Sequence, residues 1–270
     1  MKIILLLALQ FLEPDSKDSS KQEIITLATE KLVPVFTADT RAHRMSFQKN
    51  YDENSYTASM GGIFPIIDIN KNKFKGQLSA AGSTYLTLLR QSNSGSVVNT
   101  DFFADLFFDM QVSSKWAIRL GTGHTSQHLS DDAIIAGKPF RNYAKDYHQA
   151  MAIFRNPKYR LIRYFGLSYI YNYKTSSDIS NKVLIQAGFE EQPFKVSRAY
   201  LRNIYFAGDI KFRQEIEYKS TINFQLGYRI TNSEKRIFRF AYDYTIGVEE
   251  RGYFQPLQRN FSHLGIYFDF

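Results

Sequence analysis

The residues with the clearest potential for chemistry are His124 and Ser126, which are separated by one residue. On a strand, side chains two apart point the same way, so this histidine and serine can come within hydrogen-bonding reach. An imidazole beside a hydroxyl is the pair needed for nucleophilic attack on an ester, and a third group must orient the ring. Asn142, at the start of the next predicted strand, is our candidate. The pattern predicts a hydrolytic site of Ser126, His124 and Asn142.

Two other interpretations of the same stretch remain open. Ser130 can cap a helical turn whose first residues are Asp131 and Asp132, and His124, Ser126 and His128 would then hydrogen-bond the base of this loop. The two histidines and either aspartate are also suitable metal donors, but no fourth ligand follows at a recognisable spacing.

The stretch that carries the pair alternates between two faces. Trp116, Ile118 and Leu120 share one face with the histidine and serine, and Arg119 lies on the other. This period of two predicts a strand. The same alternation recurs along the chain and predicts twelve strands, at residues 42–50, 56–66, 76–89, 99–112, 115–126, 142–156, 159–173, 182–190, 202–217, 219–230, 235–248 and 258–270. Several exceed the about six residues typical of soluble sheets and match the roughly 9–11 of a tilted membrane-crossing strand.

The composition distinguishes a helical membrane protein from a transmembrane β-barrel. The 270 residues include 18 Tyr and 23 Phe but one Trp, mean hydropathy is -0.33, and no long apolar run follows the N-terminus, which excludes a helical membrane protein. The last strand places Leu264, Ile266, Phe268 and Phe270 on one face, like the C-terminal signal of outer-membrane proteins. Short connections (113–114, 156–158, 231–235) alternate with longer ones (91–98, 127–141, 249–257). We therefore predict an all-β fold, a transmembrane antiparallel β-barrel of about 12 strands with both termini periplasmic.

With the aromatic face toward lipid, the charged face lines the lumen. The expected lumen residues are Asp101, Asp105, Asp109, Arg119, Asp209, Lys211, Arg213, Glu215, Glu217, Arg229, Arg239 and Asp243. Charges of both signs favour a cross-linked polar interior over an ion-selective pore. Alternation in 142–156 sends Asn142 to the side of Asp146 and His148, which we also expect in the lumen. That placement conflicts with its role beside His124.

The remaining segments define the domains. Residues 1–20 are expected to be an export signal and disordered start, 21–41 a periplasmic segment with a short helix, and 42–270 the barrel. Arg41, His43 and Arg44 are expected to meet headgroups or solvent. The absence of cysteine excludes disulfides and Cys-bound metal. The net charge of +8 is interleaved with carboxylates, so we expect no nucleic-acid partner and an anionic lipid surface instead.

The segment His124-x-Ser126-x-His128-Leu129-x-Asp131-Asp132 resembles the motif of an uncharacterised family of predicted outer-membrane barrels. Further shared pieces are Ala38-Asp39-x-Arg41, Asn142, and Ala207-Gly208-Asp209 with Glu215. This resemblance implies fold and location but no activity. His124, Ser126 and Asn142 also resemble, in order and placement, the site of outer-membrane phospholipase A, although Gln127-His128 replaces its Asn-Gly and the spacer to Asn142 is wider. This second resemblance implies a phospholipid hydrolase that uses calcium, held by loop carboxylates that we do not assign.

These observations lead to three functional hypotheses for an integral outer-membrane protein whose partner is outer-membrane lipid. The first is a lipid acyl hydrolase using Ser126, His124 and Asn142. The second is a non-enzymatic structural or assembly component that contacts other envelope proteins. The third is a solute channel.

Overall fold

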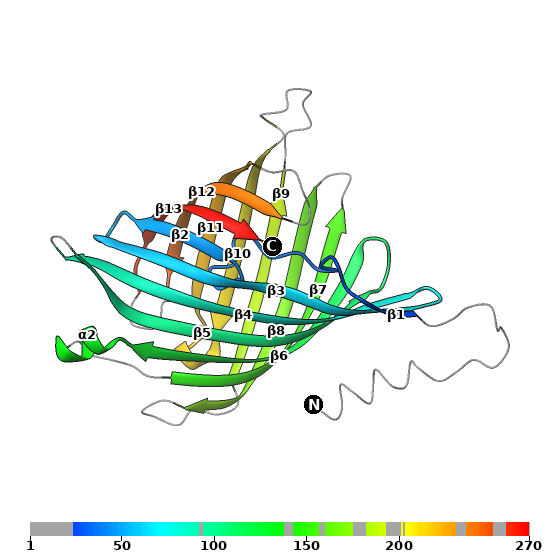
Figure 1. The fold of residues 1–270 in the computed structure, drawn as a ribbon, viewed down its shortest axis with the longest axis horizontal. Coiled ribbons are helices and arrows are strands. Elements are labelled where there is room, and N and C mark those ends of the chain that lie inside the picture. The colour runs from blue at the N-terminus through cyan, green and yellow to red at the C-terminus, as the bar shows by residue number, and fades with distance from the viewer. Residues whose placement is uncertain are drawn as a thin grey trace.

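The computed structural model describes residues 24–91, 94–137, 143–156, 160–174, 182–192, 201, 203–230, 236–250 and 258–269. Its strands form one antiparallel sheet of 13 strands (Figure 1). Strands β2 to β13 close into a barrel because β3 pairs with β2 on one side and with β4 on the other. The remaining strand, β1, pairs only with β3 among the described residues.

The strands are β1 (Ile24–Leu27), β2 (Met45–Asn50), β3 (Ser55–Lys71), β4 (Phe74–Gln91), β5 (Ser94–Gln111), β6 (Trp116–Leu129), β7 (Tyr143–Asn156), β8 (Leu161–Lys174), β9 (Lys182–Glu191), β10 (Ile204–Arg213), β11 (Lys219–Arg229), β12 (Ile237–Gly247) and β13 (Phe261–Asp269). Short helical turns occur at α2 (Asp131–Ile135) and η2 (Gln214–Ile216). We call the end of the barrel where β13 finishes the near rim, and the end that carries α2 and η2 the far rim. None of the helices in the described ranges has the length and apolar character to cross a membrane.

The predicted barrel of twelve strands is confirmed, with differences at the strand ends. The long connection expected over 91–98 is wrong, because β4 and β5 stay paired as far as Gln91 and Ser94. The β3–β4 hairpin also runs further than expected, to a tight turn in which Asn72 takes a φ of 53°. Asparagine tolerates this left-handed conformation in two-residue hairpins. At the far rim β10 stops at Arg213, and η2 follows.

The two faces of the sheet are arranged as expected for a barrel in lipid. Phe224 and Phe240 are 38% and 44% exposed on the outer face, whereas Arg213 and Arg239 are 4% and 0% exposed inside. A soluble sandwich would bury the aromatic residues and expose the arginines. This inverted arrangement supports the barrel and excludes the sandwich fold.

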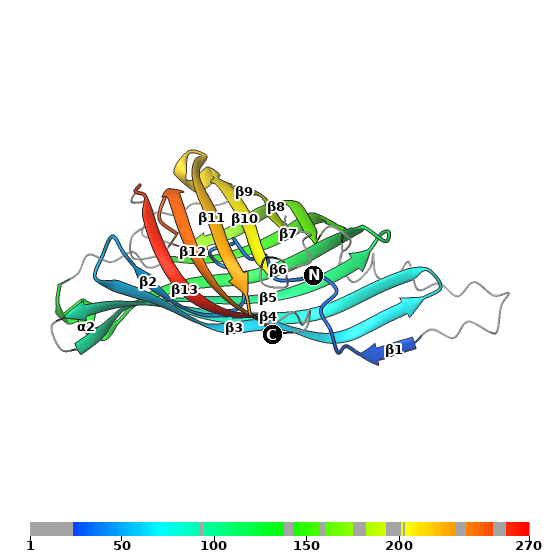
Figure 2. The ribbon, with the colours of Figure 1, turned by 90° about the horizontal axis from the view of Figure 1, so that it is seen from above.

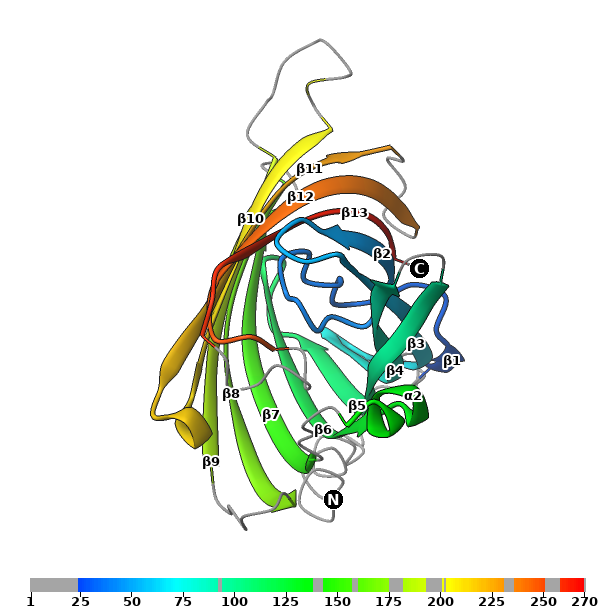
Figure 3. The ribbon, with the colours of Figure 1, turned by 90° about the vertical axis from the view of Figure 1, so that its left-hand side faces the viewer.

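Residues 28–44 pass through the interior of the barrel, and we call them the plug segment. Figure 3, a view from one end, shows this blue segment inside the ring of strands. Its apolar side chains belong to three separate buried clusters with the inner wall: Val33 and Phe36, Val35 and Ala42, and Ala38. The Phe36 ring stacks on the Tyr164 ring with 3.9 Å between centroids. The plug segment is therefore packed against the wall on several sides.

The short helix expected within residues 21–32 is wrong in its described part, because residues 24–27 form strand β1. Strand β2 pairs with β3 only as far as Ser59, so the extended end of β3 has an open edge. Strand β1 fills part of this edge, at Ile67 to Asn70 (Figure 2). The β-branched residues Ile24, Ile25 and Thr26 favour an extended backbone. The open edge of β3 then makes this segment a strand instead of a helix. The export signal expected at residues 1–20 lies outside the described residues.

Candidate active site on the outer wall and the charged interior

Strand β6 carries the candidate catalytic residues on its outer face. The burial pattern along β6 alternates here, with Thr125 and Gln127 buried toward the interior and His124 and His128 exposed on the outside. Ser126 shares the outer face and is half-buried. The expected placement of the His-x-Ser pair on the outer wall agrees with this geometry.

The His124 ring is held by Asp146, its direct partner across strands β6 and β7. The Nδ1 atom lies 2.6 Å from Asp146 Oδ1, and Asn172 Nδ2 donates to Asp146 Oδ2 at 2.6 Å. The side chains of His124 and Asp146 are 50% and 27% exposed. An ionised carboxylate only accepts hydrogen bonds, so the ring proton of this bond lies on Nδ1 and Nε2 is left as the basic nitrogen. This is the tautomer that a general base for a serine requires.

Ser126 is two residues after His124 and on the same face of the strand, so their Cα atoms are about 6.6 Å apart. No hydrogen bond joins the Ser126 hydroxyl to the His124 ring in this described stretch of β6. Bonds between catalytic groups often tighten only when substrate is bound. The cross-strand neighbours of Ser126 are Phe102 and Ala144. They give the serine an apolar surface of the kind that an acyl chain can contact.

The lumen location expected for Asp146 and His148 is wrong, because both side chains lie on the outer wall. His148 is exposed and stacks on the Tyr171 ring at 4.7 Å. The alternation of β7 is set by Met151 and Ile153, which pack inward against the plug segment. The inner wall is thus apolar at Met151 and Ile153, where Val33 and Phe36 of the plug segment pack, so polarity alone assigned the wrong face of β7. Asn142, the predicted orienting residue, lies outside the described residues.

Asn172 was not predicted, and a β-bulge explains why. The pairing of β7 with β8 passes from Asp146–Asn172 to Tyr147–Ile170, so Tyr171 is an extra residue in β8. Simple alternation from the buried Ile170 would send Asn172 inward. The bulge instead places it beside Asp146 on the outer wall. No residue type in this stretch signals the bulge.

The loop after β6 forms the helical turn that the sequence predicts. Ser130 caps α2, with Oγ accepting from the Ala133 backbone N–H at 3.2 Å, and Asp131 and Asp132 occupy the first turn. Gly137 follows with a φ of 64°. The predicted hydrogen bonds from the histidines to this loop are not formed, because His124 bonds Asp146 and the His128 ring packs edge-on against the Phe102 ring at 5.8 Å.

The interior of the barrel is cross-linked by ion pairs between wall residues. Arg119 binds Asp109 through two hydrogen bonds of 2.7 and 2.8 Å, and Arg239 binds Asp269 at 2.9 Å. Asp209 accepts from Tyr164 at 2.7 Å. Of the expected lumen residues, Glu217 is the exception, because it lies exposed in the far-rim turn after η2.

The plug segment is joined to the wall by further ion pairs. Asp39 pairs with Lys211 at 2.6 Å, and Arg41 pairs with Asp101 at 3.1 Å. The location expected for Arg41, His43 and Arg44 at headgroups is therefore wrong, since all three side chains turn inward. His43 Nε2 lies 2.8 Å from Asp105 Oδ2. A glycine adjoins this contact: a Cβ at position 123 would lie 2.1 Å from the Asp105 carboxylate.

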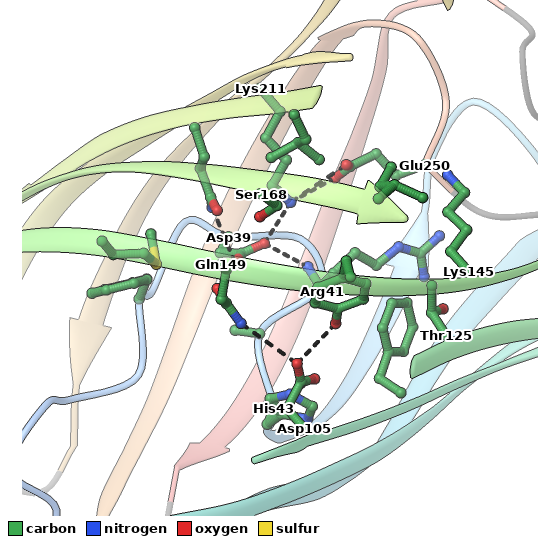
Figure 4. Close-up of a pocket in the computed structure, with 18 of the residues that line it drawn as sticks. Asp39, Arg41, His43, Asp105, Thr125, Lys145, Gln149, Ser168, Lys211 and Glu250 are labelled. Atoms are coloured by element: carbon green, nitrogen blue, oxygen red, sulfur yellow. Dashed lines mark hydrogen bonds and ion pairs between the residues drawn. The ribbon is translucent and has the colours of Figure 1, made fainter. Parts of the chain in front are cut away.

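A cavity of about 180 Å³ lies between the plug segment and the inner wall (Figure 4). Arg213 and Glu250 form an ion pair of 3.4 Å at its edge, and Lys145 binds Glu215 at 2.7 Å. Burial raises the pKa of the Glu215 carboxyl, but the Lys145 ammonium with its hydrogen bond and the Arg213 charge together lower it more, so the pKa lies below its usual value. The charged groups of this cavity thus come from the wall, the plug segment, η2 and the segment after β12.

Comparison with known families decides the relationship of the chain. Residues 22–270 match the family model described as "Protein of unknown function (DUF1207)". The chain belongs to this family. The expected resemblance to a family without an assigned activity is thereby confirmed. No curated protein sequence matches the chain.

Solved structures with a similar fold include two outer-membrane phospholipases. The calcium-bound dimer of the Salmonella typhi outer membrane phospholipase (OMPLA) has a TM-score of 0.57 and 11% identity, covering 84% of this chain and 90% of that one. Outer membrane phospholipase A from Escherichia coli has a TM-score of 0.58 and 12% identity, covering 87% of this chain and 97% of that one. At these identities the likeness shows the fold alone. This family member therefore has the fold of an outer-membrane β-barrel.

Metal donors do not gather in the part of the chain that the structure describes. No group of three or more His, Asp or Glu side chains is placed there to hold a metal ion. The predicted set of His124, His128 and Asp131 or Asp132 is thus not brought together, and the described residues offer no group of three carboxylates or histidines for the calcium that the phospholipase resemblance implies.

Proposed function

We propose that this protein is an integral outer-membrane lipid acyl hydrolase in which Ser126 is the nucleophile, His124 the general base and Asp146 the residue that orients the histidine. The observation that carries the proposal is the 2.6 Å contact of His124 Nδ1 with Asp146, on the outer wall beside Ser126. A histidine and an aspartate facing lipid are costly unless they are satisfied or used. The hydrogen bond between His124 and Asp146 offsets part of that cost and leaves Nε2 of His124 as the basic nitrogen.

The chemistry follows the roles of a serine hydrolase. Nε2 of His124 takes the proton of Ser126 as Oγ attacks the ester carbonyl of a lipid, and returns it to the leaving alcohol, which leaves the acyl group on Oγ. The same nitrogen then takes a proton from the water that attacks this acyl group and returns it to Ser126 Oγ as the fatty acid leaves. Asp146 holds the ring by Nδ1 and stabilises the imidazolium that forms. Asn172 fixes the second oxygen of the carboxylate. A lipid substrate would approach the outer wall of the barrel, because Ser126 lies on this wall next to Phe102.

Two sequence hypotheses compete with this proposal. A solute channel is less favoured because the plug segment passes through the interior and pairs with the wall at Asp39 and Arg41. A structural or assembly component of an envelope complex has no specific observation on its side. It is the hypothesis left if no lipid is hydrolysed.

The test is hydrolysis of phospholipid in mixed micelles by the purified protein. We expect wild-type turnover and a loss of about 10³-fold or more in Ser126→Ala, because removal of a nucleophile abolishes the covalent step. The matched control is Ser262→Ala, which removes a half-buried serine on β13, far from β6 in the sheet order. It should retain wild-type turnover. Equal rates for wild type and Ser126→Ala would refute the hydrolase and favour the structural component.

A further inference from the structure

The cavity between the plug segment and strands β5 to β10 is a separate candidate site, on the opposite side of the wall from Ser126. Its volume of about 180 Å³ is far above the roughly 10–15 Å³ that a site for one water needs, so it is more than a site for single bound waters. Phe103, Tyr143 and Tyr147 contribute aromatic rings to the lining. Figure 4 shows charged and polar side chains reaching into it from the wall and the plug segment.

Three of the residues that line this cavity carry a buried polar atom that has neither a hydrogen-bond partner nor an ion-pair partner. These atoms are the Thr125 hydroxyl, the Nε–H of Arg213 and the Oε2 oxygen of Glu215. Thr125 is only 6% exposed. Buried polar groups in folded proteins are almost always paired, so three such atoms around one space indicate a polar occupant. Together they offer a hydroxyl, a donor and an acceptor.

The charges of the cavity indicate a neutral occupant. Lys145 is paired with Glu215, Lys211 with Asp39, and Arg213 with Glu250. A ligand with a net charge would have to break one of these buried pairs and leave the displaced partner unpaired, which is costly. Hydroxyl groups can donate to the Glu215 oxygen and accept from Arg213 without disturbing the pairs.

We propose that this cavity binds a small neutral polyol of the monosaccharide class, with Thr125, Arg213 and Glu215 as its hydrogen-bonding residues. The aromatic lining supplies apolar surface for the C–H faces of a sugar ring. The site lies inside the barrel and takes no part in the chemistry at Ser126. Its test is therefore independent of lipid hydrolysis.

The experiment is calorimetric titration of the full-length protein in detergent micelles with glucose, galactose and mannose, and with glucuronate and glucosamine as charged counterparts. We expect saturable binding of at least one neutral sugar and weaker binding of its charged counterpart. Thr125→Val should weaken that binding roughly fivefold to tenfold, the effect of one lost hydrogen bond. Thr125→Ser keeps the hydroxyl and should bind within about twofold of wild type.

The matched control is Thr87→Val, which removes another buried wall threonine that does not line this cavity. Thr87→Val should bind the sugar with wild-type affinity. If it folds, the barrel wall tolerates valine in place of a buried threonine. Binding of charged sugars only, no binding of any neutral sugar, or unchanged binding by Thr125→Val would each overturn the proposal. A structure solved in saturating sugar with only water in the cavity would overturn it as well.

Discussion

Replacing Asp146 with asparagine tests the proposed role of the carboxylate, because the structure defines what each of its oxygens does. One oxygen accepts from His124 Nδ1 and the other from the Asn172 amide, both at 2.6 Å. An asparagine has one accepting oxygen and no charge, so Asp146→Asn can accept from only one of these donors and offers it a neutral partner. If its oxygen turns to His124, the Asn172 amide must turn over so that its own oxygen accepts from the new NH2 group, and the ring keeps its tautomer beside a neutral partner. If it turns to Asn172, the NH2 group faces the ring and forces the wrong tautomer.

The size of the loss follows from the charge-assisted bond that disappears. A hydrogen bond to a charged group contributes about 1.5–3 kcal/mol, and each 1.36 kcal/mol of transition-state stabilisation is about tenfold in rate. Loss of the bond alone therefore predicts a decrease of roughly 10- to 150-fold in kcat/KM. The wrong tautomer adds to this, up to about 10⁴-fold in total, as for other serine hydrolases that lose the orienting aspartate.

The double variant Asp146→Asn with Asn172→Asp is the variant to compare with Asp146→Asn. The introduced amide can accept from His124 and donate to the introduced carboxylate at position 172. The correct tautomer of His124 is then kept, while the negative charge moves from position 146 to position 172. We expect the double variant to recover at least about tenfold over Asp146→Asn in phospholipid hydrolysis. Asp146→Asn within threefold of wild type, or a double variant no faster than the single one, would refute the assignment of Asp146.

Two further predictions concern the interior. Arg239→Met should lower the free energy of unfolding by about 3–5 kcal/mol, because it leaves Asp269 buried without its cation. The exposed Lys219→Met should cost under about 1 kcal/mol. Guanidinium unfolding followed by fluorescence of the single tryptophan measures both, and a loss below about 1 kcal/mol for Arg239→Met would contradict the buried pair. Since the folded pKa of Glu215 is lowered by Lys145, its stabilisation is present above the usual glutamate pKa of about 4.3 and is lost as the pH falls through the lower folded value. The stability gap between wild type and Glu215→Gln should therefore narrow between neutral and acidic pH, and a constant gap would show that the Glu215 pKa is not lowered.

Much of the fold follows from local rules that the sequence displays. A period of two in alternating aromatic and charged residues is a property of each strand by itself, as in Phe224 and Phe240 against Arg239. It fixes which side chains share a face wherever the strand is regular. The helical turn at α2 was equally predictable, because Ser130 as a cap and Gly137 beyond the end act on their own backbone. The shared face of His124 and Ser126 has the same local origin.

What the sequence could not decide depends on partners far away in the chain. Residues 24–27 form a strand because β3 has an open edge there, and residues 28–44 are ordered by pairs such as Asp39 with Lys211, which are 172 positions apart. The phase of β7 was misassigned because part of its inner face, at Met151 and Ile153, packs against apolar residues of the plug segment. The bulge at Tyr171, which brings Asn172 to Asp146, depends on how β8 registers against β7. The sequence by itself determined the barrel and the position of the His-x-Ser pair, because these depend on neighbours within one strand. Only the tertiary structure decided which carboxylate holds the histidine and what fills the interior, because these depend on register and on space between strands.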